Sequence, residues 1–157
     1  SGYDNVVHPG TNGKMIEVCA AMGLANLDGF DAIVDANTCN HAAYKAALAG
    51  IPGVRLLDYD SFEQNSHHYV VAEIGPGCAA SRDAIIAALH AENVLARKYF
   101  WPGCHGTQPY RDLFPHAGLM LRNTSTIAER VLVLPNGLSL GSSAITNICE
   151  VISAVAR

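Results

Sequence analysis

The side chains best suited to chemistry gather in one segment, which runs from Leu89 to Arg111. The segment holds the only tryptophan of the chain, and its aromatic and polar residues include Tyr99, Phe100, Trp101, Cys104, His105, Gln108, Tyr110 and Arg111. Prolines and glycines interrupt it, and loops of that composition expose their backbone and side chains. We therefore predict that the segment lines a binding pocket. A loop that only caps the core with aromatic side chains is the alternative.

Cys104 and His105 have the residue types of a nucleophile and its base. Adjacent residues seldom point at each other, however, and no carboxylate is marked to orient the imidazole, so we do not expect this chemistry. His67 and His68 begin a predicted strand, where alternation turns them to opposite faces and brings one of them to a pocket. The histidines and cysteines lack the spacing of metal ligands, and no metal site is predicted.

The segment from Gly10 to Lys14 resembles a phosphate-binding loop, because glycines precede a lysine at the start of a predicted helix. It lacks the spacing of the P-loop, and Met15 follows the lysine where that motif needs serine or threonine. Free amide groups and the dipole at a helix start still favour an anion. The segment therefore indicates either anion binding or ordinary helix capping.

The composition favours one globular domain of 157 residues. Half of the residues are hydrophobic and 15% are charged, which excludes a disordered chain and indicates that a subunit or domain covers part of the surface. The net charge of −4 leaves no electrostatic footprint for nucleic acid or an anionic membrane. The five cysteines lack disulfide or zinc spacing, and no signal peptide or membrane span is recognisable. We expect a cytoplasmic protein without nucleic-acid or membrane partners.

A turn-rich loop, residues 1–13, leads into two bracing helices over residues 14–49, and residues 50–157 form the rest of a single predicted domain. Hydrophobic periodicity predicts strands at 54–59, 68–74, 94–100 and 131–134, and helices at 81–93, 124–130 and 142–155. Ser81 is predicted to cap its helix, and Asn93 to end it in a left-handed conformation. This order predicts an α/β (α+β) fold, with helices packed on a small mixed or antiparallel sheet.

Long segments of the chain resemble the DegT/DnrJ/EryC1/StrS family of nucleotide-sugar aminotransferases. The matching segments are GTNGKMIEVCAAMGLANLD (10–28), the helix with Asn40 and Tyr44, IPGVRLLDYD (51–60), HHYVV (67–71), SRDAIIAALHAENVLARKYFWPGCHGTQPYR (81–111) and IAERVLVLPNG (127–137). The resemblance implies the small C-terminal domain of the aspartate-aminotransferase fold (fold type I). It also implies pyridoxal phosphate (PLP) as cofactor of the parent enzyme, and transfer of an amino group from glutamate to a dTDP-linked keto-sugar.

The resemblance assigns roles to individual residues. The family has a G-x-N-x-[RK]-M segment whose asparagine crosses the dimer interface to the cofactor phosphate of the partner subunit. Asn12 stands at that position. The nucleotide sugar is expected to contact Lys14, His67, His68, Tyr99, Trp101 and His105. His105 is the first candidate in the aromatic loop, and one of the two adjacent histidines is a lesser one.

The chain departs from the family at the catalytic lysine. The family attaches its cofactor to a lysine upstream of the Asn12 segment, and none of Lys14, Lys45 and Lys98 stands at that position. We expect no catalytic residue and no activity in this chain alone, with the large PLP-binding domain outside it. The alternatives are a short non-catalytic paralogue, which binds nucleotide sugars or serves as a dimerisation partner, and one half of a split aminotransferase. We expect homodimerisation or other self-association through the helices at 14–49.

Overall fold

The structure, a computed structural model, describes residues 13–60 and 62–157. The chain divides into two compact units between Asp31 and Ala32. The elements are α1 (Glu17–Asp28), α2 (Phe30–Leu48), β1 (Val54–Leu56), β2 (Val70–Ile74), α3 (Arg82–Ala91), the 3-10 helix η1 (Cys104–Gly106), α4 (Tyr110–Leu113), α5 (Ala117–Met120), α6 (Arg122–Arg130), β3 (Val131–Leu134) and α7 (Ser142–Ala156). Asn12 and all but the last residue of the predicted loop at 1–13 lie outside the described residues.

Helix α1 follows an extended residue, Ile16, and ends at Gly29. Its alanine, leucine and methionine residues favour a helix, and the carboxylate of Glu17 in the first turn complements the helix dipole. The helix buries none of its side chains: Val18, Met22 and Leu24 are 64%, 63% and 66% exposed. Helices with apolar residues all round normally pack against another element or subunit.

Three antiparallel strands form the sheet, in the order β1-β2-β3. In the register of the sheet, Val54 pairs with Ile74 and Val70 pairs with Leu134. Side chains along β2 alternate between buried and half-buried, as expected for a strand with one covered face. The predicted small sheet is thus confirmed as an antiparallel one.

A single apolar core covers that face of the sheet. It includes Tyr44 from α2, Leu89 from α3, Leu132 from β3 and Ile152 from α7, all 1% exposed or less. The Tyr44 hydroxyl donates to the Pro135 carbonyl at 3.0 Å, so its one polar group is paired inside the core. The helices on the sheet therefore position the loops that leave its edges.

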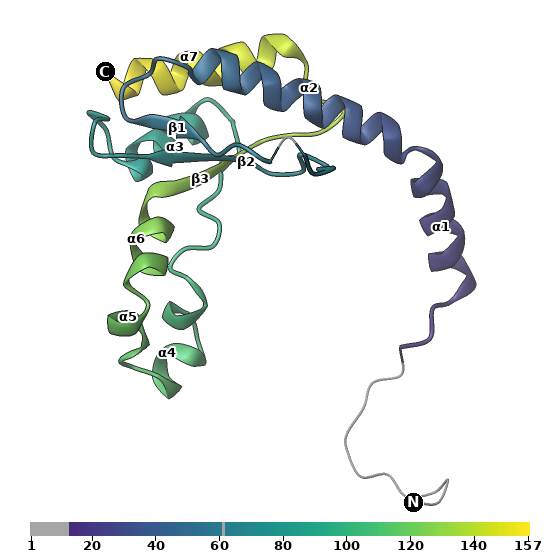
Figure 1. Cartoon of the computed structure of the whole chain (residues 1–157), viewed down its shortest axis with the longest axis horizontal. Coiled ribbons are helices and arrows are strands. Elements are labelled where there is room, and N and C mark those ends of the chain that lie inside the picture. Colours follow the sequence, from purple (N-terminus) through teal and green to yellow (C-terminus); the bar gives the residue numbers. More distant parts are fainter. Residues whose placement is uncertain (1–12, 61) are drawn as a thin grey trace, which may run out of the picture. The chain divides into compact units, whose positions relative to one another are not determined.

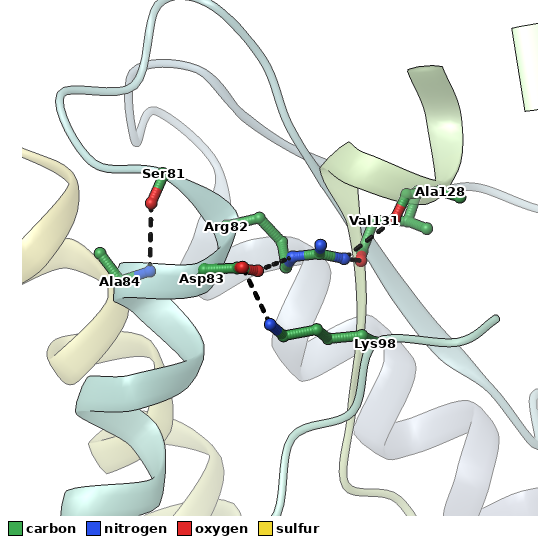
Figure 2. Close-up of polar contacts among 7 residues, drawn as sticks. All are labelled: Ser81, Arg82, Asp83, Ala84, Lys98, Ala128 and Val131. Carbon is green, nitrogen blue, oxygen red and sulfur yellow. Dashed lines mark hydrogen bonds and ion pairs between the residues drawn. The ribbon is translucent and has the colours of Figure 1, made fainter. Parts of the chain in front are cut away.

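The predicted ends of α3 are confirmed. The Ser81 hydroxyl accepts a hydrogen bond from the amide of Ala84 at 3.2 Å, which caps the helix (Figure 2). Asn93 has a φ of 59°, the left-handed conformation that asparagine tolerates at a helix end. These two local signals fix where the helix starts and stops.

The predicted strand at 94–100 is wrong, because only Arg97 forms a bridge, to Val133. On one side, the amide of Ala96 donates to the Val94 carbonyl at 2.9 Å. On the other, the amide of Trp101 donates to the Lys98 carbonyl at 2.8 Å. Backbone groups that a strand would use are thus engaged locally, and pairing stops after one residue.

Two further predicted strands are shorter than expected. The strand at 54–59 ends at Leu56, and the strand at 68–74 begins at Val70, so His67 and His68 precede it. Sequence analysis also missed η1, α4 and α5, which occupy the segment after the aromatic residues. Figure 1 shows α4 and α5 on an extension that leads away from the sheet and returns to it through α6 and β3.

Candidate functional site

The aromatic loop, which contains the residues from Tyr99 to Arg111, begins at the edge of the sheet. Arg97 and Val133 exchange backbone hydrogen bonds of 3.0 and 2.8 Å, and the turn at Lys98–Trp101 follows at once. The chain then passes through η1 and α4 before it reaches α5 and α6, and α6 runs directly into β3. Both ends of the segment from Lys98 to Arg130 are therefore attached to β3.

Gly103 allows the loop to fold tightly around His105. Its φ of 87° is strained for any residue with a side chain, and a Cβ at this position would lie 2.9 Å from Cε1 of the His105 ring. A Cβ on Gly118, in α5, would lie 3.8 Å from Cδ2 of the same ring. Two glycines thus pack the half-buried imidazole from different parts of the loop.

The third contact of His105 comes from α6, where Ser125 Oγ lies 3.0 Å from His105 Nε2. The Ser125 hydroxyl also lies 3.2 Å from the Leu121 carbonyl, to which it donates. A hydroxyl has a single proton to donate. Because the Ser125 hydroxyl donates to the Leu121 carbonyl, the imidazole Nε2–H is the donor in the bond between His105 and Ser125. This arrangement leaves His105 Nδ1 as an acceptor for a further partner.

Tyr99 and Phe100, a few residues before this histidine in the chain, form an aromatic wall. Their rings stack with centroids 4.8 Å apart and an interplanar angle of 21°. Both line a cavity of about 530 Å³, together with Cys104, Thr124 and Ile127. No carboxylate or lysine is among the described residues that line the cavity, so the arrangement suits binding of an apolar or aromatic ring better than acid–base chemistry.

Trp101 points elsewhere. It is 52% exposed, does not line the cavity, and its ring centroid lies 5.6 Å from the Lys98 ammonium. The structure therefore brings Tyr99 to the cavity, places His105 one residue beyond the cavity-lining Cys104, and leaves Trp101 on an exposed part of the loop.

His68 is connected to the aromatic wall through Tyr69. The ring centroids of His68 and Tyr69 are 4.7 Å apart, and those of Tyr69 and Tyr99 are 5.8 Å apart, edge to face. Sequence reasoning missed Tyr69 as a link in this chain of rings, although its residue type and its place beside His68 were available signals. Ser125 was missed as well, and nothing local in the sequence marks it.

His67 turns towards α2. Its Nδ1 lies 3.1 Å from Thr38 Oγ1, and its ring centroid lies 4.9 Å from that of His41 and 5.0 Å from that of Tyr59. The two adjacent histidines thus have different neighbours, although the strand that was to separate them begins only at Val70. Burial lowers the pKa of His41 below its ordinary value, so the neutral form of His41 is favoured.

Lys14 is exposed ahead of α1, and Asn12 lies outside the described residues. Lys45 pairs with Asp58, and Lys98 pairs with Asp83 at 2.9 Å. In the part of the chain that the structure describes, no lysine lines the cavity at Tyr99 and Phe100 or the cavity of about 540 Å³ between α3 and α7.

Known proteins resemble this chain over most of its length. The model of the DegT/DnrJ/EryC1/StrS aminotransferase family matches residues 2–153. The chain belongs to this family. The dTDP-4-amino-4,6-dideoxy-D-glucose transaminase of Escherichia coli is 29% identical over 147 residues, which are 94% of this chain and 40% of that protein.

Solved structures of the family share the fold. The crystal structure of DesI in the presence of its TDP-sugar product is 44% identical, with a TM-score of 0.85 over 94% of this chain and 37% of DesI. The crystal structure of S. venezuelae DesV in complex with a ketimine intermediate is 22% identical, with a TM-score of 0.83 over 99% of this chain and 40% of DesV. The predicted fold of fold type I aminotransferases is confirmed. The chain spans about two-fifths of the length of these relatives.

Pyridoxal phosphate is the cofactor that membership of the family implies. Covalent attachment needs a lysine in a pocket, and the described lysines are exposed or paired with surface carboxylates. The described residues therefore do not fit a covalent PLP site. They also contain no group of three or more histidine, cysteine or acidic residues that could hold a metal ion, and no helix among them is long and apolar enough to cross a membrane.

Proposed function

We propose that this chain is the small domain of a PLP-dependent aminotransferase that transfers an amino group, from glutamate, to a dTDP-linked keto-sugar. The observation that carries the proposal is the likeness to DesI, which was solved with its TDP-sugar product and matches 94% of this chain at 44% identity. The similarity to the Escherichia coli transaminase, which acts on a dTDP-amino-sugar, supports the same substrate class.

The aromatic wall is the part of the chain that suits the nucleotide. Tyr99 and Phe100 present stacked rings on a cavity of about 530 Å³, which is large enough for a ring of the substrate. His105, held from Nε2 by Ser125, keeps Nδ1 available as an acceptor for a hydroxyl or amide of the substrate. His68 extends the row of rings through Tyr69, and Trp101 adds an exposed aromatic surface.

The remaining assignments concern the assembled enzyme. Asn12 would reach the cofactor phosphate of the partner subunit, with Lys14 beside it as a basic substrate contact, in a homodimer formed through the helices at 14–49. PLP bound by the parent enzyme would supply an electron sink for the transamination. Because no described lysine suits it, these residues alone would bind and orient the substrate and would not transaminate.

Nuclear magnetic resonance of the chain tests the substrate proposal. Titration with dTDP-glucose is expected to shift the resonances of the His105 imidazole and the Trp101 indole, with saturation in the millimolar range because the site is incomplete. GDP-mannose serves as the control nucleotide sugar, and Tyr99→Ala should weaken the response. Absence of any shift with dTDP-glucose at millimolar concentration would count against the proposal.

The affinity measured in this titration and a mixing experiment separate the alternatives. Micromolar affinity of the chain alone would favour a non-catalytic nucleotide-sugar binder. Recovery of transamination on mixing the chain with a separately produced lysine-bearing domain would favour a split enzyme.

A further inference from the structure

The start of α3 carries a buried arginine beside an exposed aspartate. Arg82 is 5% exposed, whereas the Asp83 side chain is 58% exposed. We propose that Arg82 and Asp83 are positioning residues that fix both ends of the aromatic loop, one through α6 and the other through Lys98. The inference deepens the proposed function, since it rests on the role of that loop in binding a nucleotide sugar.

Arg82 holds the junction between α6 and β3. Its Nη1 donates to the carbonyls of Ala128 and Val131, both at 3.0 Å (Figure 2). Ala128 lies in the last turn of α6, where carbonyls lack partners within the helix, and Val131 is the first residue of β3. A buried guanidinium is costly unless its donors are paired, so these bonds fix α6 at one distance from α3.

That position of α6 decides where His105 lies. Ser125 is one turn before Ala128 on α6, and it accepts the hydrogen bond from His105 Nε2 at 3.0 Å. A shift of the end of α6 would therefore move Ser125 and release the imidazole. Arg82 thus acts on His105 through a helix, without touching it.

Asp83 fixes the other end of the loop. Its carboxylate accepts from Arg82 Nε and forms a 2.9 Å ion pair with the Lys98 ammonium (Figure 2). Lys98 precedes the cavity-lining Tyr99, and its ammonium lies 5.6 Å from the Trp101 ring. The hydrogen bond from Lys98, followed by that from Arg82, also lowers the pKa of the Asp83 carboxyl, which stays ionised at neutral pH.

Together these contacts connect two points that are far apart in the sequence. The segment between Lys98 and Ala128 contains every predicted substrate residue of the loop, and both ends of that segment meet adjacent residues of α3. Exposed ion pairs contribute little to stability, so loss of the Asp83–Lys98 contact is expected to affect the loop beside Lys98 with little change in the stability of the fold.

The test uses Trp101, the only tryptophan of the chain, as a reporter of the loop. Asp83→Asn is expected to raise acrylamide quenching of Trp101 roughly twofold, because that end of the loop then keeps only the Arg97–Val133 backbone bonds and the loop opens more often. The far-UV circular dichroism spectrum and the midpoint of thermal unfolding should stay close to those of the wild type. Asp58→Asn is the matched control, since the Asp58 side chain is 56% exposed, close to the 58% of Asp83, and pairs with Lys45 away from the loop.

Arg82→Lys tests the second arm through the resonances of the His105 imidazole. A lysine side chain ends one bond short of the Arg82 Nη1 position and has no Nε–H for Asp83, so it cannot reproduce all three bonds, and the His105 resonances should shift and broaden. Arg82→Ala should do so more strongly. If Arg82→Ala fails to fold, Arg82→Lys and Asp83→Asn decide the question. Arg82→Lys retains the positive charge, and Asp83→Asn alters only an exposed side chain.

The outcomes separate this inference from the proposed function. Unchanged Trp101 quenching in Asp83→Asn together with unchanged His105 resonances in Arg82→Lys would overturn it. Changes in both readouts, with reduced affinity for dTDP-glucose, would support both proposals. Changes in both readouts in a chain whose wild type does not bind dTDP-glucose would support the positioning role and reject the substrate.

Discussion

His105 and Ser125 are 20 residues apart in the chain, yet Nε2 of the histidine lies 3.0 Å from the serine hydroxyl oxygen. The bond joins η1 to α6 across the loop that carries the candidate site. Since the Ser125 hydroxyl donates its hydrogen bond to the Leu121 carbonyl, the bond also selects the His105 tautomer with a proton on Nε2. The bond therefore fixes the orientation of the ring and, in the neutral imidazole, the nitrogen that carries the proton.

Ser125→Ala should release this histidine. Loss of the acceptor leaves a half-buried donor unpaired, which we expect to cost about 1–2 kcal/mol of unfolding free energy and to weaken binding of dTDP-glucose. Urea denaturation and the nuclear magnetic resonance titration measure the two effects. Ser143→Ala, at an exposed serine of α7, is the control and should change neither.

Gly103→Ala should distort the same site from the other side. The positive φ and the approach to 2.9 Å from His105 Cε1 both oppose a side chain, and strain of this kind costs about 1–3 kcal/mol. Urea denaturation should show that loss of stability, and the His105 ring resonances should shift. Gly141→Ala is the control, because Gly141 has a φ of −83° and open space around its Cβ direction. Equal stability of the two variants would contradict this account of the loop.

Sequence reasoning succeeded where a signal was local. Ser81 beside the start of α3 and Asn93 at its end are recognisable from residue type alone. The strand expected at 94–100 failed because the turn from Lys98 to Trp101 outweighs the β propensity of the neighbouring residues.

Contacts between distant segments were beyond the reach of sequence reasoning. The bonds from Arg82 to Ala128 and from His105 to Ser125 join residues 46 and 20 positions apart. Such pairs depend on how α3, α6 and the loop pack, and no periodicity or motif in a single sequence encodes that packing. The residue types of the loop were therefore predictable, but the residues that hold them in place were not.

Acid should destabilise the domain through His41. The pKa of His41 lies below the ordinary value of 6.5, and burial is the largest cause. The charges of His67 and Lys45 lower it further, whereas the Leu57 carbonyl and Asp58 raise it. The unfolded chain then binds a proton more readily than the folded one, so the unfolding free energy should fall as the pH drops below about 6.5.

Urea denaturation at several pH values between neutral and about 5.5 measures this slope, and His41→Gln should reduce it. His116→Gln, at an exposed histidine, should leave the slope unchanged. The carboxylates of Asp58 and Asp83 have lowered pKa values, so their contributions are lost only at more acidic pH, below 3.8. A slope that His41→Gln does not alter would assign the acid sensitivity to other groups.

The chain alone should form no stoichiometric covalent adduct with PLP. Lys45 and Lys98 are paired with carboxylates, and Lys14 is exposed outside any described cavity, so none offers a binding pocket for the cofactor. Incubation with PLP, reduction with borohydride and mass spectrometry should yield only scattered, substoichiometric labelling. A stoichiometric pyridoxyl group on one lysine would refute the prediction of an inactive chain.

The chain should associate with itself through α1. Val18, Met22 and Leu24 are exposed on a helix that buries no side chain, and exposed apolar surface of this extent favours assembly. Met22→Glu combined with Leu24→Glu should therefore shift the chain to a monomer in sedimentation-velocity ultracentrifugation.

Leu138→Glu is the matched control, because Leu138 is 64% exposed and lies in the turn after β3. A wild-type chain that sediments as a monomer at high micromolar concentration would exclude self-association through α1. Assembly that survives the double substitution on α1 but is lost in Leu138→Glu would instead locate the contact on residues 32–157. Either result would remove the support that α1 gives to the proposed dimer, in which Asn12 reaches the partner subunit.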